Sequence, residues 1–252
     1  MKAMLSGYLG TLALAALVGL SLGALGSGGS IITTPVLVYV AGIPPDRAVG
    51  TSLFIVGATS LVGALIQLRR GKVERMPVLF FALSGMAGSY IGSAWTHMVS
   101  GRTLMLIFAG IMLVVGTAMW LGSSGLRQSN SCNPYKCIAA GLGVGLLTGF
   151  IGIGGGFLIV PALVLFAGLE SRKAMGTSLA IITFNSATGF LGQLRYVQMD
   201  WTFVAAFLAF AITGMVAGIA ISGRLPDAQL KRIFAVTVVV LGVVVGLKNI
   251  LN

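Results

Sequence analysis

Long apolar runs, separated by short polar or glycine-rich breaks, dominate this chain. Runs of 18 or more apolar residues are typical of membrane-spanning helices, and they lack the alternation of a membrane β-barrel strand. The pattern predicts an all-α, polytopic transmembrane helical protein. Apolar helical segments are expected at 5–25, 30–41, 48–68, 77–98, 103–121, 137–150, 156–168, 174–194, 202–222 and 229–250.

The order of these segments repeats after 126 residues. A glycine cluster at 26–30, with the sequence GSGGS, is followed by Pro35, and a second cluster at 152–156, GIGGG, is followed by Pro161. Many other positions keep the same offset, and transporters are commonly built from such duplications. Because the chain has 252 residues, we expect a single integral membrane domain made of two transmembrane repeats, 1–126 and 127–252.

The repeats are parallel or inverted according to the path of the glycine-broken segment, 5–41 in the first half. A single kinked crossing gives parallel repeats, whereas a segment that turns back at the glycines, by re-entering or by crossing twice, gives inverted ones. If it turns back, 11 of the 16 Lys and Arg lie on one side; the other five are Lys2, Arg47, Arg102, Arg195 and Lys248. A single crossing divides the charges almost evenly. The positive-inside rule therefore favours inverted repeats, with both termini outside.

Composition excludes an ordinary soluble domain. The chain is 57% hydrophobic and only 8% charged, against about 25% charged residues in soluble proteins. A net charge of +11 would suggest a nucleic-acid partner in a soluble protein, but here the basic residues lie in short loops, where they orient helices. We expect a lipid bilayer as partner and no nucleic acid.

The few chemically reactive residues disfavour an enzyme. Cys132 and Cys137 lie in a polar linker without a nearby histidine, so we expect two unpaired thiols and no metal site. No nucleophile–base pair stands out, and no cofactor is expected. No carboxylate lies in mid-membrane to relay protons or hold a cation, which favours an anion as the transported solute. All five acidic residues lie in predicted loops: Asp46, Glu74, Glu170, Asp200 and Asp227.

Each glycine cluster interrupts an apolar run, and glycine permits an unwound backbone. Such backbone is tolerated at membrane depth only where protein or a water-filled cavity satisfies it. New helices are expected to start at about Ser30 and Gly156, where unpaired N–H groups and a partial positive charge favour an anion. The alternative role of glycine is close helix packing, which we expect for Gly85, Gly88 and Gly92.

The candidate binding residues surround the two breaks and the helix starts that follow them. They are Ser27, Gly28, Gly29, Ser30, Thr33, Thr51, Ser52, Gly154, Gly155, Gly156, Thr177, Ser178 and Asn185. Hydroxyl groups can donate hydrogen bonds to an anion, although a bond to their own helix is an equal alternative for the Thr-Ser pairs. Gln67, Arg69, Gln193 and Arg195 are predicted pathway or entrance residues, with bilayer anchoring as the alternative for the arginines.

The glycine clusters with their prolines, followed by A-x-G-T-S-L at Ala48–Leu53 and Ala174–Leu179, resemble the sulfite exporter TauE/SafE family of bacterial membrane permeases over essentially the whole chain. The resemblance implies transport of small sulfur-containing anions, such as sulfite, thiosulfate or sulfonates, across the bacterial cytoplasmic (inner) membrane by a multi-pass protein. Family members are often described with eight predicted helices, whereas the charge distribution here favours an odd number of crossings in each half.

These observations predict a secondary transporter for small anions, a permease or exporter, with sulfur oxyanions or organosulfonates as the leading substrates. Alternating access around a midplane site at the two glycine breaks is the expected mechanism. The alternatives are a channel-like or cation-coupled transporter of another solute, and a membrane scaffold or sensor that transports nothing. A homo-oligomer is an open alternative to a monomer.

Overall fold

The computed structural model of the chain describes residues 2–26, 28–95, 100–121, 134–151, 156–194, 198–224 and 226–251. Within these residues all regular structure is helical, and each predicted apolar segment is a helix whose limits differ from the expected ones by a few residues. The helices are α1 (Lys2–Leu25), α2 (Gly28–Tyr39), α3 (Pro45–Arg69), α4 (Arg75–Trp95), α5 (Gly101–Leu121), α6 (Pro134–Ile151), α7 (Gly156–Phe166), α8 (Ser171–Gln193), α9 (Trp201–Ser222) and α10 (Asp227–Leu251). The predicted all-α fold is confirmed.

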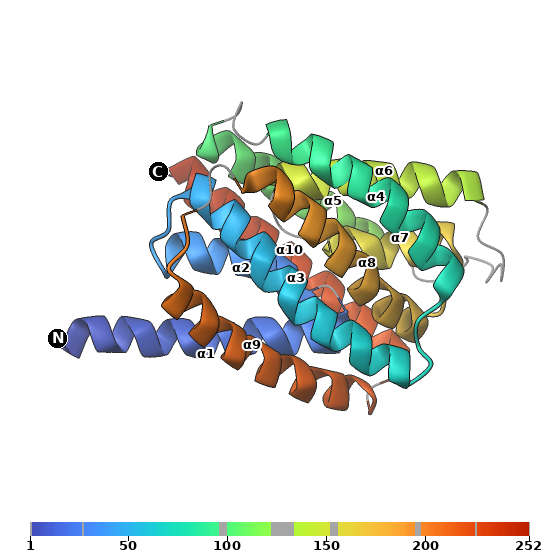
Figure 1. The fold of residues 1–252 in the computed structure, drawn as a ribbon, viewed down its shortest axis with the longest axis horizontal. Coiled ribbons are helices and arrows are strands. Elements are labelled where there is room, and N and C mark those ends of the chain that lie inside the picture. Colours follow the sequence, from blue (N-terminus) through green and yellow to red (C-terminus); the bar gives the residue numbers. More distant parts are fainter. Residues whose placement is uncertain are drawn as a thin grey trace.

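The first glycine cluster separates two antiparallel helices. Gly26 has a φ of 71°, a left-handed conformation that suits glycine. Helix α2 then returns beside α1, so closely that a Cβ atom at Gly29 would collide with the carbonyl oxygen of Val18. The start of α1 and the end of α2 therefore lie at the same end of the molecule (Figure 1). Of the two paths considered for this segment, the chain follows the one that turns back.

Helices α3 and α8 cross at the centre of the molecule in opposite directions. A Cβ at Gly57 would lie 3.1 Å from Cβ of Ser186, whereas one at Gly63 would lie 3.1 Å from Cδ1 of Leu179. Both helices bury most of their inner residues, and their contact is continuous with the apolar core around α7. The inner faces of both helices therefore form the centre of the core, whereas Leu61 and Phe184 on their outer faces are 48% and 47% exposed.

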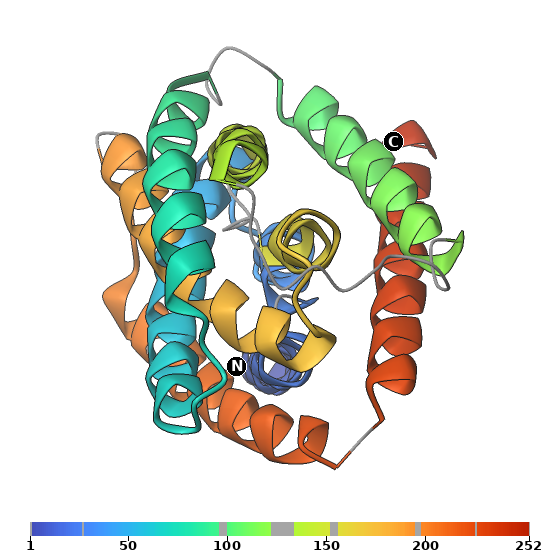
Figure 2. The same ribbon diagram turned by 90° about the vertical axis from the view of Figure 1, so that its right-hand side faces the viewer.

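The remaining helices pair across the two halves of the sequence. Helix α1 packs on α9, α6 packs on α4, and α5 packs on α10 along one edge (Figure 2). Glycines bring the backbones together: a Cβ at Gly19 would collide with the carbonyl oxygen of Ala211, and one at Gly145 with that of Gly85. Gly19 and Gly145 are 126 positions apart. Each half therefore covers its first helix with the fourth helix of the other half.

The packing role predicted for the scattered glycines is confirmed. A Cβ at Gly88 or at Gly92 would collide with a carbonyl oxygen of α6, and one at Gly85 would lie 2.6 Å from the side-chain amide of Asn185. Small residues of this kind let membrane helices approach closely.

Several described helices are suited to a bilayer. Three stretches within the described residues are long and apolar enough to cross it: Arg47–Arg69, Arg75–Ala94 and Trp201–Ser222. Shorter apolar helical stretches are Gly10–Leu25, Met105–Val114, Cys137–Phe150 and Ala235–Leu247.

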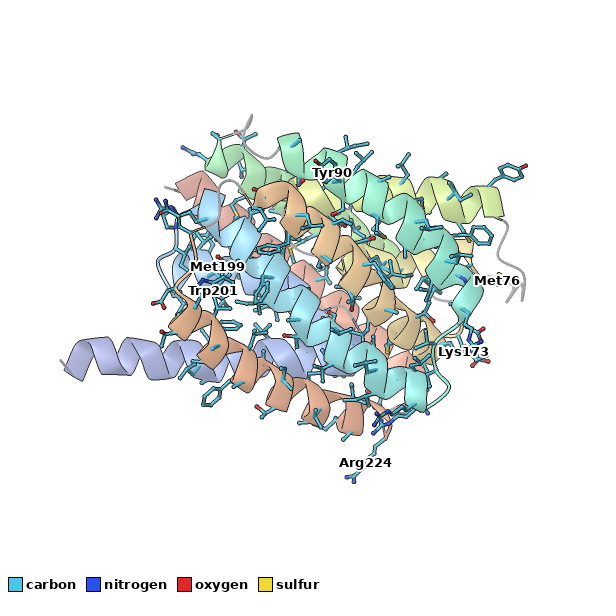
Figure 3. The ribbon with its side chains drawn as sticks, viewed as in Figure 1. Met76, Tyr90, Lys173, Met199, Trp201 and Arg224 are labelled. Atoms are coloured by element: carbon cyan, nitrogen blue, oxygen red, sulfur yellow. The ribbon has the colours of Figure 1, made fainter. Side chains whose placement is uncertain are left out.

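The two ends of the molecule differ in charge. Helices α3 and α9 end, and α4, α8 and α10 begin, at the end where Lys173 and Arg224 lie (Figure 3). We call this the basic end, defined by Arg69, Arg70, Lys72, Arg75, Arg172, Lys173 and Arg224. Helix α1 begins and α10 ends at the opposite end (Figure 1).

The expectation of two unpaired thiols was wrong. Cys137, in the first turn of α6, is fully buried and disulfide-bonded. The only other cysteine of the chain is Cys132, which lies outside the described residues.

Candidate functional site

The backbone at the first glycine break is held by the other half of the sequence. The buried Ser178 hydroxyl, in α8, donates hydrogen bonds to the carbonyl oxygens of Gly26 and Met175, each over 2.8 Å. A serine from the G-T-S-L segment therefore satisfies a carbonyl group that the end of α1 leaves free. This contact joins the two features on which the sequence analysis depended, the glycine break and the segment Gly176–Leu179.

Other predicted hydroxyl groups bond to nearby backbone. Thr33 donates to the carbonyl oxygen of Gly29 over 2.8 Å, and Thr51 donates to that of Arg47 over 3.0 Å. Ser52 donates to the carbonyl oxygen of Val49 and accepts from the hydroxyl of Thr34. For Thr51 and Ser52, the bond to their own helix, which was one of the two interpretations, is therefore present.

Helices α3 and α8 hold buried polar atoms without hydrogen-bond partners among the described residues. They are Oγ of Ser60, Oε1 of Gln67, Oδ1 of Asn185 and Oγ of Ser186, and we call these four residues the α3–α8 polar cluster. Each residue is at most 4% exposed. An unsatisfied buried polar group costs about 1–3 kcal/mol, so a polar ligand or water that supplied partners here would be bound favourably.

Sequence reasoning selected Gln67 and Asn185 but missed Ser60 and Ser186. The missed serines are 126 positions apart, so the repeat itself was the signal that could have found them. Asn185 stands against Gly85, and its backbone carbonyl accepts a hydrogen bond from Ser89 over 2.9 Å. The amide of Gln193 donates to the carbonyl oxygen of Ser93 over 3.0 Å. The two glutamines, although equivalent in the repeat, are thus bonded differently.

Some of the predicted site residues lie outside the described part of the chain. These are Ser27, Gly154, Gly155 and Arg195, together with the side chain of Ser30. Gly28 and Gly156 are the first residues of α2 and α7, close to the expected helix starts. Arg69 is exposed at the end of α3. That both breaks contribute to one anion site stays a prediction.

A cavity of about 660 Å³ opens near the end opposite the basic end. It lies between the turn that joins α2 to α3, the start of α9 and the side of α1. Its polar lining includes Thr11, Arg47, Thr51, Gln198 and Asp200. The Asp200 carboxylate caps α9 by accepting from the backbone N–H groups of Thr202 and Phe203 over 3.0 and 3.2 Å.

The corresponding region at the basic end is bridged by an ion pair. Nζ of Lys173 donates to Oε1 of Glu74 over 2.7 Å, and the backbone N–H of Glu74 donates to the hydroxyl of Thr177 over 3.0 Å. The Glu74 carboxylate raises the pKa of Lys173 above its ordinary value, so the lysine stays charged at neutral pH. These contacts tie the turn before α4 to the first turns of α8.

The chain has clear relatives. The family description "Sulfite exporter TauE/SafE" matches residues 11–245. A probable membrane transporter protein of Xylella fastidiosa (strain 9a5c) is 35% identical, with 91% of each chain covered. One of Bacillus subtilis (strain 168) is 25% identical, with 86% of this chain and 89% of the relative covered. One of the archaeon Methanocaldococcus jannaschii is 25% identical, with 83% and 82% covered. No solved structure matches.

These relatives are similar over nearly their whole length, and the family match spans both glycine clusters. The relatives are named as membrane transporters, not as enzymes. The chain is therefore a multi-pass membrane protein that belongs to the TauE/SafE sulfite exporter family of transporters.

Proposed function

We propose that this protein is a secondary transporter of small sulfur-containing anions, either sulfur oxyanions or organosulfonates, that works by alternating access. The substrate class follows from the family description, "Sulfite exporter". Backbone N–H groups at the starts of α2 and α7, near Gly28, Gly29 and Gly156, supply positive helix ends for the anion. The second cluster contributes Gly154 and Gly155 in the same way.

The observation that carries the proposal is the α3–α8 polar cluster. Its two hydroxyl groups and two amide oxygens are buried and lack partners among the described residues, although burying them that way is unfavourable. The unpartnered hydroxyl groups of Ser60 and Ser186 can donate hydrogen bonds to oxyanion oxygens, whereas the unpartnered amide oxygens of Gln67 and Asn185 accept hydrogen bonds and suit a bound water or a protonated group. A transported anion needs such contacts, because it must be bound firmly enough to enter and weakly enough to leave.

The path of the chain supports two inverted repeats. Positions 126 residues apart make matching contacts, such as Gly19 with Ala211 and Gly145 with Gly85. The α1–α9 and α4–α6 pairs exchange under this offset, whereas α3–α8 and α5–α10 each map onto themselves. Such a pattern is expected for a pseudo-two-fold axis through the α3–α8 crossing, and many transporters place their substrate on such an axis.

We place the protein in the bacterial cytoplasmic membrane, with the basic end facing the cytoplasm. The relatives include bacterial transporters, and the basic end gathers the Lys and Arg side chains that the positive-inside rule assigns to the cytoplasm. The cavity beside Arg47 then opens toward the outside.

Thermal stabilisation tests the proposal. We expect sulfite, thiosulfate or methanesulfonate to raise the Tm of the purified protein, because a ligand at a hundred times its Kd stabilises the folded state by about 2.7 kcal/mol. Sulfate and chloride at equal ionic strength are the comparison anions.

Serine variants connect this effect to the polar cluster. Ser186→Ala is expected to raise the anion-free Tm, because it removes an unsatisfied hydroxyl, and to reduce the anion-dependent shift. Ser222→Ala, which removes a hydroxyl bonded to the carbonyl oxygen of Ile219, is the matched control and should keep the full shift. If no anion raises the Tm and Ser186→Ala behaves like its control, the proposal is wrong and a scaffold or sensor becomes the better interpretation.

A further inference from the structure

The ion pair at the basic end has a counterpart in the repeat. Lys173 is 126 positions after Arg47, and Asp200 is 126 positions after Glu74. The basic residue stands near the start of α3 or α8, and the acidic residue precedes α9 or α4. The two members of each pair therefore come from different halves of the sequence. Inverted repeats would place the two pairs at opposite ends of the molecule.

The two pairs differ in state. Lys173 and Glu74 are bonded over 2.7 Å, whereas Arg47 and Asp200 both line the cavity of about 660 Å³, and no ion pair joins these two described residues. The neighbouring threonines differ as well. Thr177 accepts from the backbone N–H of Glu74, while its counterpart Thr51 donates to the carbonyl oxygen of Arg47 within its own helix.

The segments that correspond to the cavity lining are joined at the basic end. Thr11 lines the cavity although its side chain is only 4% exposed, and the residue 126 positions later, Cys137, is also buried. A Cβ at Gly176 would lie 2.5 Å from the carbonyl oxygen of Lys72, which shows how closely the turn before α4 packs on α8. Equivalent segments are therefore joined by an ion pair and by close packing at the basic end, whereas at the opposite end they line a cavity.

We infer that Lys173–Glu74 and Arg47–Asp200 are alternating gates: Arg47 and Asp200 pair and close the cavity when Lys173 and Glu74 separate. This inference rests on the proposed function, because it assigns two access states to the same transporter. In the open state the Arg47 guanidinium faces the cavity and attracts an incoming anion; on closure the Asp200 carboxylate takes the place of that anion.

The energetics suit a reversible gate. The side chains of Lys173 and Glu74 are 47% and 40% exposed, and exposed ion pairs contribute little to stability. Exchanging one such pair for the other changes the free energy little, so both access states can be populated. Asp200 also caps α9, which holds its carboxylate at the cavity in both states.

Thiol labelling at the two equivalent positions tests the gates. One probe is native Cys137 in a Cys132→Ala background; the other is Thr11→Cys in a background with both native cysteines changed to alanine. Each is reacted with the neutral reagent N-ethylmaleimide in nanodiscs, and an unchanged Tm checks the fold of every variant. We expect Glu74→Gln and Lys173→Gln to speed labelling of Cys137 and to slow labelling of the Thr11→Cys probe. Changes of about two- to fivefold correspond to the loss of one exposed ion pair.

The variants of the other pair should act in the opposite direction. Asp200→Asn, which keeps a good helix cap, and Arg47→Gln should speed labelling of the Thr11→Cys probe and slow that of Cys137. Removing an acid and removing a base change the local potential with opposite signs. A purely electrostatic effect on thiol reactivity would therefore change the labelling rates of the two variants of one pair in opposite directions. Gate opening would change both rates in the same direction.

The outcomes distinguish the gates from the proposed function. Labelling needs no substrate. Reciprocal changes in labelling without any anion-dependent rise in Tm would therefore support the gates and contradict the proposed anion substrate. Anion stabilisation without reciprocal labelling would overturn the gates and leave the proposed function in place. If the two variants of one pair change the labelling rates in opposite directions, the gate proposal is wrong and both pairs are only surface contacts.

Discussion

At the scale of single residues, glycine acts in two ways in this protein. Gly26 needs a left-handed backbone at the end of α1, whereas Gly88 and Gly92 leave room for another helix. Gly29 was expected to coordinate an anion through its N–H group, and it is also a packing residue, because Val18 and Leu22 lie against its Cα. The sequence identifies such glycines readily, but only the tertiary contact tells the two roles apart.

Two glycines of α6 provide a direct test of the packing role. A Cβ at Gly145 would collide with the carbonyl oxygen of Gly85, whereas one at Gly143 would have nothing within 4 Å. Gly145→Ala is therefore expected to lower stability by about 1–3 kcal/mol through overpacking. Gly143→Ala, two positions away, should leave the protein unchanged or about 1 kcal/mol more stable, because alanine favours a helix. Tm values in one detergent decide between these outcomes, and equal effects would contradict the assigned contact.

At the scale of helices, the apolar pattern predicted the ten helices of the described residues, because each apolar segment is bounded by glycine, proline or charged residues. The pattern could not predict which helices pair, since α1 meets α9 through contacts that only tertiary packing brings together. The turn back at Gly26 was one of two alternatives, and loop charge chose correctly between them. The hydrogen bond from Ser178 to Gly26 was beyond sequence reasoning, because both serines of the G-T-S-L segments were equally eligible.

That hydrogen bond has a measurable role. Ser178→Ala leaves the carbonyl group of Gly26 without this donor, and we expect a loss of about 1–3 kcal/mol in stability. Thr237→Ala is the control: the Thr237 hydroxyl is exposed and bonds only to the carbonyl oxygen of Ile233 in its own helix, so the change should stay within about 0.5 kcal/mol. Chemical or thermal unfolding of the two variants compares them. A Ser178→Ala protein as stable as its control would show that the break does not depend on α8.

At the scale of the whole molecule, the repeat does not reveal that equivalent residues of the two halves differ in their contacts. The repeat predicts Glu74 and Asp200 as equivalent residues, yet one is in an ion pair and the other caps a helix beside a cavity. Under the proposed alternating-access mechanism, the repeated sequence would encode both access states, of which this structure presents one. This is why the candidate residues could be located from the repeat whereas the open cavity could not.

The orientation of the molecule makes a prediction about redox state. Cys137 begins α6 close to the basic end, which we place in the cytoplasm, where thiols are kept reduced. We therefore expect Cys137 to be free in growing cells and to form its disulfide after purification in air. Acid quenching followed by alkylation with a maleimide-linked polymer and gel analysis reads out the thiols. A disulfide already complete in quenched cells would indicate that the basic end faces outside.

Terminal tags examine the same orientation independently. Helix α1 begins and α10 ends at the end opposite the basic end (Figure 1). Tags fused to the N-terminus and to the C-terminus should therefore both be accessible to an impermeant reagent at the outer face of spheroplasts. A tag buried in the cytoplasm at either terminus would contradict the positive-inside assignment. A cytoplasmic reporter in the turn between α3 and α4 is the matched control.

The exchange of helices between the halves also bears on how such a protein arose. Gly19 and Gly145 each rest on a helix supplied by the other half, so a chain of half this length would leave its glycine surface uncovered. A second copy of that shorter chain, inserted upside down in the same membrane, would cover it. If the two halves are inverted repeats, as we propose, the simplest ancestor would be a small protein that entered the bilayer in both orientations and formed an antiparallel dimer. Fusion of two such genes would have fixed each copy in one orientation and allowed Glu74 and Asp200 to diverge.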